Sequence, residues 1–317
     1  MKIIPTTIGG YPRPDWFKGY LKEVEGSQRG DIKEIEESRY RRALGEVLEE
    51  QKKSGIVLFT DGQLLWQDFL CHLCTKIGGF EMGGLIRYFD NNVYYRMPKA
   101  TAKLSGEMDI VVGEFRTAHE IESEIKAVLS CFTLAGLSKD EFYRDKKEFI
   151  LDIAEVMNHE ARKLVDAGAR HIQIDEPSLL YADKEDLETA REAVDVIRRG
   201  VEAEFFLTTY FGDAEKIFPE ILDFDVDVLG LDFVEGGDKN IELLREYKTK
   251  KDIQAGIVDG RTTKIEKPGD VKDRVNAVVE VIDGETLYVS PNTGLEFLPY
   301  QKASEKLRMM CDSVDLI

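Results

Sequence analysis

The sequence predicts an α/β protein, a single (β/α)8 TIM barrel over residues 1–317 with an inserted β-hairpin region at 80–115. Two observations lead to this fold class. Short apolar strands alternate with amphipathic helices along most of the chain, which is the pattern of parallel strands joined by helical crossovers. Eight such strands can be counted. That number favours a closed barrel over an open doubly wound sheet, the alternative for the same pattern.

The first half of the chain holds the irregular part of this pattern. The expected elements are, in order, a strand at 2–8, a charged helix at 31–54 that ends at Gly55, a buried strand at 56–60, a helix at 63–76 and, within the insertion, a strand at 109–115. Asp90-Asn91-Asn92 separates two apolar runs, 86–89 and 93–96, which predicts a β-hairpin.

From residue 126 onward, strands and helices alternate regularly. The segment Ser138-Lys139-Asp140-Glu141 predicts a capping box that opens a long helix, and Gly168 ends that helix. The expected elements are a strand at 126–131, a helix at 141–167, a strand at 171–175, a helix at 184–199, a strand at 205–210, a helix at 214–222, a strand at 226–232, a helix at 241–247, a strand at 253–258, a helix at 271–282, a strand at 287–289 and a helix at 300–311.

The composition argues against several classes of partner. Aspartate and glutamate number 61 against 43 lysines and arginines, and the formal net charge is −18. This charge repels phosphate backbones and anionic lipids, so we expect neither nucleic acid nor a membrane as partner. No apolar stretch approaches the ~20 residues that span a bilayer, and the first residues do not resemble a signal peptide. Four cysteines do not make a disulfide framework in a chain of this length, which favours a cytoplasmic protein.

Polar residues gather where the predicted strands end. In a (β/α)8 barrel these ends converge on one mouth, where the chemistry takes place. The alternative is that these residues are polar only because loops are solvated. The segments are 6–13, 60–63, 175–177, 208–210, 232, 259–261 and 290–294, and they carry carboxylates, hydroxyls and two arginines.

Asp175 and Glu176 follow a buried strand directly. Adjacent residues of a strand face opposite ways, so one carboxylate is expected to contact the ligand and the other to support the structure. A carboxylate at the mouth suits the ammonium group of a substrate, or acid–base work if its pKa is raised.

Two other features have competing interpretations. Cys71-His72-Leu73-Cys74 supplies only half of a tetrahedral metal site, and cysteines on an apolar helix face are more often plain core, so no metal is predicted there. The aromatic stretch 88–95 would stack on a planar ligand or form the cross-strand pairs of the hairpin. Glycine-rich phosphate loops are absent.

The strand-end segments together resemble the cobalamin-independent methionine synthase family. Its members are (β/α)8 barrels that move a methyl group from a folate to the homocysteine thiol through zinc. Segments 207–211 and 88–98 are similar to the zinc-free N-terminal barrel of full-length members, and 132–135 and 172–177 to the catalytic barrel. The matching segments cover nearly the whole chain and are 6–14, 60–63, 132–135, 172–177, 207–211, 225–228, 256–259 and 291–295.

The departures from this family concern the metal. The zinc ligands of the catalytic barrel are a His-x-Cys, a Glu and a late Cys. Here these places correspond to Thr208 with Tyr210, to Asp232 and to Thr293. Two hydroxyls, a phenol and one carboxylate make a poor tetrahedral site, so we expect neither zinc nor another tightly bound cofactor.

The resemblance also implies roles for single residues. Asp175 would hold the substrate ammonium, Arg261 stands in place of a proton-donating histidine, and Gln63 in place of an ammonium-binding glutamate. With Asp232 in the place of the zinc-binding glutamate, the predicted catalytic residues are Asp175, Asp232 and Arg261. Those predicted to bind substrate are Ile8, Gly9, Gly10, Gln63, Asp175, Glu176, Tyr210, Asn292 and Thr293, and those predicted to bind a pterin are Arg13, Lys18 and Trp66.

Three functions agree with these features. The first is a methyltransferase that moves a methyl group from a folate, pterin or corrinoid donor to a thiol without zinc, with Arg261 or Lys103 stabilising the thiolate. The second is an accessory barrel that binds a pterin or partners a separate catalytic barrel. The third is a metal-free folate or pterin enzyme of one-carbon chemistry.

Overall fold

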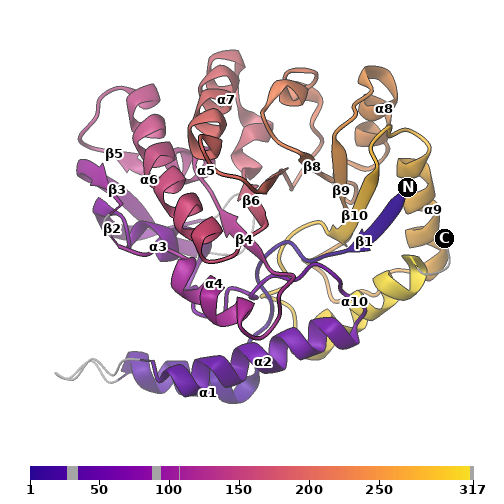
Figure 1. Cartoon of the computed structure of the whole chain (residues 1–317), viewed down its shortest axis with the longest axis horizontal. Helices are drawn as coiled ribbons and strands as arrows, with labels where there is room; N and C mark the ends of the chain where they lie inside the picture. Colours follow the sequence, from indigo (N-terminus) through magenta and orange to yellow (C-terminus); the bar gives the residue numbers. More distant parts are fainter. Residues whose placement is uncertain (27–34, 88–93, 107, 315–317) are drawn as a thin grey trace.

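The computed structural model describes residues 1–26, 35–87, 94–106 and 108–314. Its centre is a seven-stranded parallel sheet in the order β1-β10-β9-β8-β7-β6-β4 (Figure 1). The strands are β1 (Lys2–Pro5), β4 (Lys126–Leu129), β6 (His171–Asp175), β7 (Glu204–Thr208), β8 (Val228–Asp232), β9 (Asp252–Val258) and β10 (Thr286–Pro291).

A short segment closes this sheet into a barrel. Isolated parallel bridges join Thr6 to Leu58 and Phe59 to Ile125, so the segment lies between β1 and β4. The N–H of Lys126 donates to the Phe59 carbonyl at 2.8 Å. The expected strand at 56–60 is therefore present as an eighth, shorter β-segment of the barrel wall. The TIM-barrel prediction is confirmed, and the open sheet is excluded by this closure.

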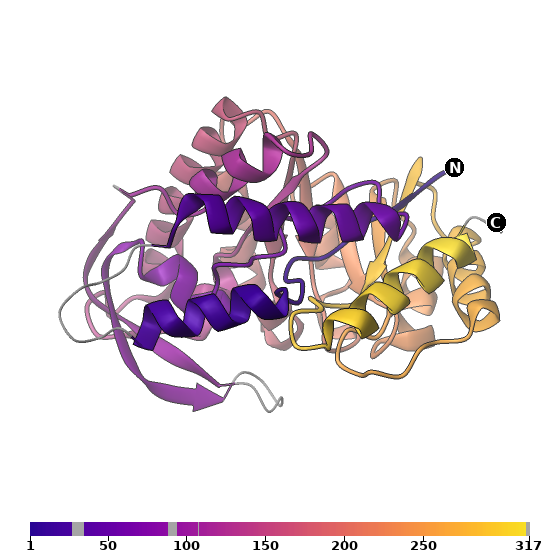
Figure 2. The same cartoon turned by 90° about the horizontal axis from the view of Figure 1, so that it is seen from below.

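Helices surround the barrel. In the second half of the chain, α6 (Lys146–Asp166) precedes β6, whereas α7 (Lys184–Arg198), α8 (Gly237–Tyr247) and α9 (Pro268–Val279) follow β6, β8 and β9, in agreement with the expected alternation. The view from below shows α2 (Glu37–Lys53) beside α1 (Asp15–Gly26), and α10 (Tyr300–Val314) packs on α2 (Figure 2). Among the described residues, no helix combines the length and the apolar character needed to cross a membrane.

The insertion forms a second, three-stranded sheet of β2 (Gly78–Arg87), β3 (Tyr94–Ser105) and β5 (Lys139–Asp140). β2 and β3 are antiparallel, with Arg87 opposite Tyr94, which confirms the hairpin for the described residues. The expected turn at 90–92 lies outside them. In Figure 2 the hairpin extends from one end of the molecule.

Two expectations for this region are wrong. Residues 109–115 are not a strand, because helix α4 (Val112–His119) occupies most of this range. One carboxylate oxygen of Glu160, from the distant helix α6, accepts the N–H groups of Ile110, Val111 and Val112 at 2.6–3.0 Å and so caps α4. This cap comes from another part of the chain and leaves no local signal.

The capping box at 138–141 is also wrong. Residues 139–140 pair with β3, and α6 begins at Lys146, where the Asp145 side chain accepts the N–H of Glu148 at 3.0 Å. Asp140 instead accepts the N–H groups of residues 142, 143 and 144, which stabilises the turn between β5 and α6.

Two further helices are shorter or of another kind than expected. The segment 214–222 consists of the 3-10 turns η2 (Glu215–Ile217) and η3 (Glu220–Asp223). Only α3 (Phe69–Cys74) remains of the helix expected at 63–76. Asp68 caps α3 by accepting the N–H groups of Leu70 and Cys71. The loop that precedes α3 is thereby left to line the barrel mouth.

Candidate active site

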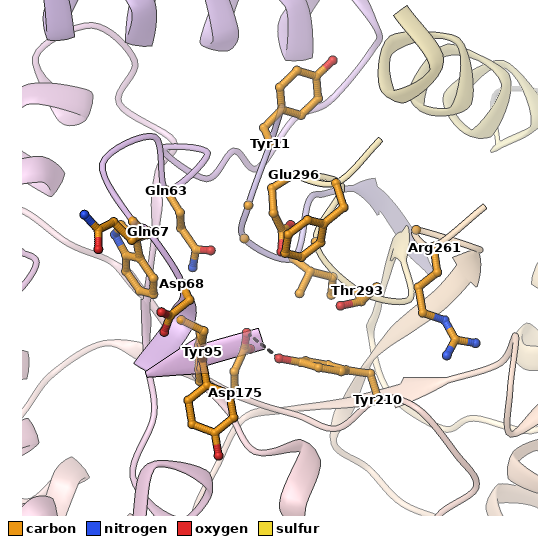
Figure 3. A pocket seen from close by; sticks show the side chains of 18 of the residues that line it. Tyr11, Gln63, Gln67, Asp68, Tyr95, Asp175, Tyr210, Arg261, Thr293 and Glu296 are labelled. Carbon is orange, nitrogen blue, oxygen red and sulfur yellow. Dashed lines mark hydrogen bonds between the residues drawn. The ribbon is translucent and has the colours of Figure 1, made fainter. Parts of the chain in front are cut away.

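A cavity of about 580 Å³ lies at the mouth, where the barrel strands end (Figure 3). Most of the predicted site residues line it, namely Ile8, Gly9, Gly10, Arg13, Lys18, Gln63, Trp66, Asp175, Tyr210, Arg261 and Thr293. Glu176, Asp232 and Asn292 are absent from its lining. The convergence of strand ends therefore brings together segments that are far apart in the sequence.

Asp175 ends β6 and carries a buried carboxylate at the cavity floor. Gln173 donates to its Oδ1 from Nε2 at 2.5 Å, and the Tyr210 hydroxyl donates to its Oδ2 at 3.5 Å (Figure 3). Burial raises the pKa of Asp175 to about 8, although the Gln173 hydrogen bond acts in the opposite direction. A cationic ligand at the cavity floor would favour the carboxylate form.

Glu176 points in another direction, as strand alternation predicts. Its carboxylate accepts the N–H groups of Cys131, Phe132 and Thr133 at 2.6–3.0 Å, at the start of α5 (Phe132–Gly136). Burial raises the pKa of Glu176 to about 7, while these donors act against that rise. Of the two adjacent carboxylates, Asp175 faces the cavity and Glu176 ties the end of β6 to the start of α5.

Asp232 and Asn292 have structural roles close to the mouth. The Asp232 carboxylate accepts N–H groups from Phe211, Val234 and Glu235 at 2.8–2.9 Å. Asn292 donates to the same carboxylate at 3.1 Å and accepts the N–H of Gly260 at 2.9 Å. Asp232 therefore organises three loops from behind the cavity wall.

Two glycines bring a carboxylate against the cavity wall. A Cβ placed on Gly10 or on Gly294 would lie 2.3 or 2.2 Å from Glu296 Oε2. The N–H of Leu295 also donates to the Gly10 carbonyl at 2.8 Å, which ties the loop after β10 to that after β1. Glu296 lines the cavity and is itself an exposed residue. Glu296 and Gln63 lie on two sides of the cavity in Figure 3.

Aromatic rings line the cavity, and they come from Trp66, Phe69, Tyr95, Phe211 and Phe297. The Trp66 and Phe69 rings lie 6.0 Å apart and form what we call the aromatic side. The Trp66 ring stacks on His72 with a centroid distance of 4.7 Å, and its Nε1 donates to Glu114 at 3.1 Å. Of the aromatic stretch at 88–95, the described part therefore places Tyr95 at the cavity, and residues 88–93 lie outside the described residues.

The three cationic residues predicted to contact ligands have different partners within the protein. Arg13 donates to the carbonyls of Leu64, at 2.6 Å, and of Trp66, and thereby holds the loop before α3. Lys18 lies 3.5 Å from Asp15. Arg261 pairs with Glu235 and points away from Asp175 in Figure 3. Lys103, the alternative to Arg261, is on β3 and does not line the cavity.

The donors at the positions that correspond to the family's zinc site do not fit zinc. The Thr208 hydroxyl accepts from Gln254 at 3.3 Å, Tyr210 is bonded to Asp175, and Asp232 is occupied by backbone N–H groups. Cys71, Cys74, Cys131 and Cys311 are buried and do not line the cavity. In the described part of the chain, no group of three or more His, Cys, Asp or Glu residues is placed to hold a metal ion. Thiolate and imidazole are the usual zinc ligands, and the described residues that line this cavity supply neither group.

Several lining residues escaped the prediction, namely Tyr11, Gln67, Asp68, Phe69, Leu70, Tyr95, Phe211, Gly260, Gly294, Glu296 and Phe297. Some had a local signal, because Gly260 and Gly294 lie inside the strand-end segments and Glu296 lies just beyond one. Gln67 to Leu70 had none, since the periodic pattern assigned them to a helix.

The chain is thus a (β/α)8-barrel protein with an acidic, aromatic-walled cavity at the carboxyl ends of its strands. The family model described as cobalamin-independent synthase, catalytic domain, matches residues 3–315. The chain belongs to the cobalamin-independent methionine synthase family, as its motifs indicated.

Two relatives show the extent of this similarity. The methionine synthase of Saccharolobus solfataricus is 29% identical over 321 aligned positions, which cover 100% of this chain and 96% of that protein. The methionine synthase of Sulfurisphaera tokodaii is 28% identical over 321 positions, which cover 100% and 93%. The similarity therefore spans the whole barrel.

Solved structures share the fold. A B12-independent methionine synthase from Shewanella sp. W3-18-1, in complex with selenomethionine, superposes with a TM-score of 0.88 at 20% identity and covers 100% of this chain and 98% of that one. A putative vitamin-B12 independent methionine synthase from Listeria monocytogenes gives a TM-score of 0.75 at 16% identity, with coverage of 100% and 99%.

Proposed function

We propose that this protein transfers a methyl group to the thiol of an amino acid such as homocysteine, without the zinc used by its family. The observation that carries this proposal is the Asp175 carboxylate at the cavity floor. A carboxylate in a partly desolvated pocket binds an ammonium group through charge-assisted hydrogen bonds. Asp175 would hold the amino group of the acceptor and direct its side chain into the cavity.

The amino acid would occupy the part of the cavity between Asp175, Gln63 and the loop after β1. The Shewanella protein of the same fold was determined in complex with selenomethionine, the selenium analogue of a methylated product. A thioether amino acid is therefore a fitting first ligand for the corresponding end of this cavity.

The aromatic side would receive the methyl donor. A cavity of about 580 Å³ is within the size range of small-molecule sites and has room for a planar ring beside a small amino acid. Trp66 offers a stacking surface, and Lys18 lies at the cavity, where it could meet an anionic tail. A methylated folate or pterin is the donor that these residues favour, and a methylated corrinoid protein is the alternative.

Without zinc, the acceptor thiol has to lose its proton to the protein. A thiol has an ordinary pKa of about 8.5. Glu296 is the candidate base because its carboxylate lines the cavity. The S–H proton would pass to Glu296, the sulfur would bond to the methyl carbon, and the donor's carbon–nitrogen bond would break with its electrons on nitrogen. That nitrogen would then take up a proton.

The absence of histidine and cysteine from the described cavity lining favours a second candidate. In this function the chain is an accessory barrel that binds a pterin and assists a separate, zinc-bearing catalytic barrel. A metal-free folate or pterin enzyme with another one-carbon reaction is a further alternative. The three functions differ in which ligands bind and in whether the isolated chain turns over.

The test combines calorimetry with a methyl-transfer assay. Homocysteine and methylated folates or pterins are titrated separately and together, and methionine formation is followed by mass spectrometry with zinc and with a chelator. Methionine formation that survives the chelator and disappears in Glu296→Gln supports the proposal. Pterin binding without turnover indicates the accessory barrel. If the chain converts the pterin at a rate that homocysteine does not change, it is another one-carbon enzyme. Turnover that requires zinc would contradict the proposal.

A further inference from the structure

A lysine lies inside the barrel beneath the cavity. Lys126 is the first residue of β4, and its side chain is 1% exposed in the barrel interior. Lysine is almost never fully buried unless its charge is compensated, because removing an ammonium group from water is costly. Lys126 therefore requires a specific compensating environment.

The direct contacts of Lys126 are neutral. Its Nζ donates to Gln254 Oε1 at 2.7 Å and lies 4.7 Å from the centroid of the Phe206 ring. Among the described residues, the Lys126 ammonium group forms no ion pair with a carboxylate within 4.0 Å. The negative charge that compensates this ammonium group must act from further away.

Hydrogen bonds connect this lysine to the cavity floor. Gln254 accepts from Lys126 and donates to Thr208 Oγ1 at 3.3 Å. Thr208 pairs in register with Asp175 across β6 and β7. The chain of contacts thus begins in the barrel interior and ends beside the cavity carboxylate.

Two carboxylates act on Lys126, namely Asp175 and Glu204. Glu204 already has partners, because it accepts from Tyr288 at 3.0 Å and lies 2.7 Å from His171 Nδ1. Asp175 has neutral donors in Gln173 and Tyr210 and feels the repulsion of Glu176. The described ion pairs do not include Asp175, and the charge of the buried Lys126 favours its carboxylate form.

We propose that Lys126 is a positioning residue whose charge favours the carboxylate form of Asp175 and thereby assists the binding of a ligand ammonium group. Burial raises the pKa of Asp175 and lowers that of Lys126, and each charge opposes the shift of the other. The two side chains enter the barrel from different strands, so the charge reaches the cavity without occupying space in it. The ligand chemistry rests on the proposed function, whereas the coupling between the two residues does not.

A ligand-independent measurement tests the coupling first. The carboxyl carbon of Asp175 is followed by 13C NMR between pH 5 and 10, with Asp175→Asn to assign its signal. In Lys126→Met we expect the titration midpoint to rise by about one pH unit, because the nearby positive charge is removed. Glu204→Gln removes the other carboxylate that acts on Lys126 and is the matched control. It should move the Asp175 titration midpoint less than Lys126→Met does. An unchanged midpoint in Lys126→Met would overturn the proposal.

Binding then tests the consequence. Methionine affinity is measured by calorimetry over the same pH range, and we expect Lys126→Met to bind about tenfold more weakly near pH 7. The affinity of a thioether acid without an amino group should not fall in this way. Equal methionine affinity in the wild type and in Lys126→Met would contradict the binding role. If thermal unfolding shows that Lys126→Met does not fold, Lys126→Gln is used in its place. If the wild type binds no amino acid, the proposed function fails, while the NMR result still decides the coupling.

Discussion

The hydroxyl of Tyr210 donates to Oδ2 of Asp175 across the cavity floor, at 3.5 Å. Tyr210 stands where the resemblance places a zinc-binding cysteine of the family. In this position the phenol hydroxyl is hydrogen-bonded to the Asp175 carboxylate. Gln173 occupies the other oxygen of Asp175, so each oxygen has one protein donor and can accept a further one from an ammonium group.

Replacing the Asp175 carboxylate should abolish most amino-acid binding. In Asp175→Asn we expect methionine or homocysteine affinity to fall about 10- to 100-fold, because a charge-assisted hydrogen bond is worth about 1.5–3 kcal/mol. Calorimetry measures the change. Tyr210→Phe is the comparison, since it removes one donor and keeps the charge, and it should lose less. Unchanged affinity in Asp175→Asn would refute the ammonium site.

The same substitution should change how stability depends on pH. The pKa of Asp175 is raised to about 8 in the folded protein, chiefly by burial, and is about 3.9 in an unfolded chain. Between these values the unfolded chain has released a proton that the folded protein keeps, so this group lowers stability as pH rises, by at most about 1.4 kcal/mol per pH unit.

We therefore expect Asp175→Asn to gain stability relative to the wild type between pH 5 and pH 8. Urea unfolding at several pH values measures this difference. Parallel pH profiles for the two proteins would show that Asp175 does not titrate in this window.

Ligand binding on the aromatic side should be visible in tryptophan fluorescence. The chain has two tryptophans, and only Trp66 lines the cavity. A pterin that stacks near it should quench part of the emission. Trp66→Phe should remove this response, whereas Trp16→Phe should keep it, because Trp16 contacts Glu46 and Arg42 on the outer helices. Retained quenching in Trp66→Phe would place the pterin elsewhere.

Gly10 is expected to control the position of Glu296. In Gly10→Ala the new Cβ would overlap the Glu296 carboxylate, and this flexible end of the side chain must move. We expect turnover to fall to the level of Glu296→Ala with little change in thermal stability. The double variant should be no worse than either single variant, since both act on one carboxylate. Additive losses would show that Gly10 acts independently of Glu296.

Glu176 should matter for stability. Glu176→Gln replaces a carboxylate that accepts three N–H groups with an amide that has one acceptor oxygen. We expect a loss of about 2–3 kcal/mol in the free energy of unfolding at pH 8. Glu188→Gln, on the exposed face of α7, is the matched control and should change stability little. Equal stabilities for these two variants would contradict the structural role of Glu176.

Local patterns determined most of the barrel. Apolar runs such as 171–175 formed the expected strands, because a buried parallel strand must be apolar over its whole length. The order of Asp175 and Glu176 also fixed their opposite directions. The strand-end segments predicted most of the cavity, since the fold brings every strand end to the same mouth.

Tertiary contacts decided what these patterns left open. The start of α4 depends on Glu160, about fifty residues further along, and the loop from Gln67 to Leu70 lines the cavity only because α3 begins late. Locally, Lys126 is the polar first residue of a strand, yet its side chain is buried inside the barrel and donates to Gln254. The sequence by itself determined the barrel, its polar mouth and the family. Only the three-dimensional packing decided which carboxylate faces the cavity and is available to a ligand. Burial, capping and charge compensation depend on neighbours that are distant in sequence.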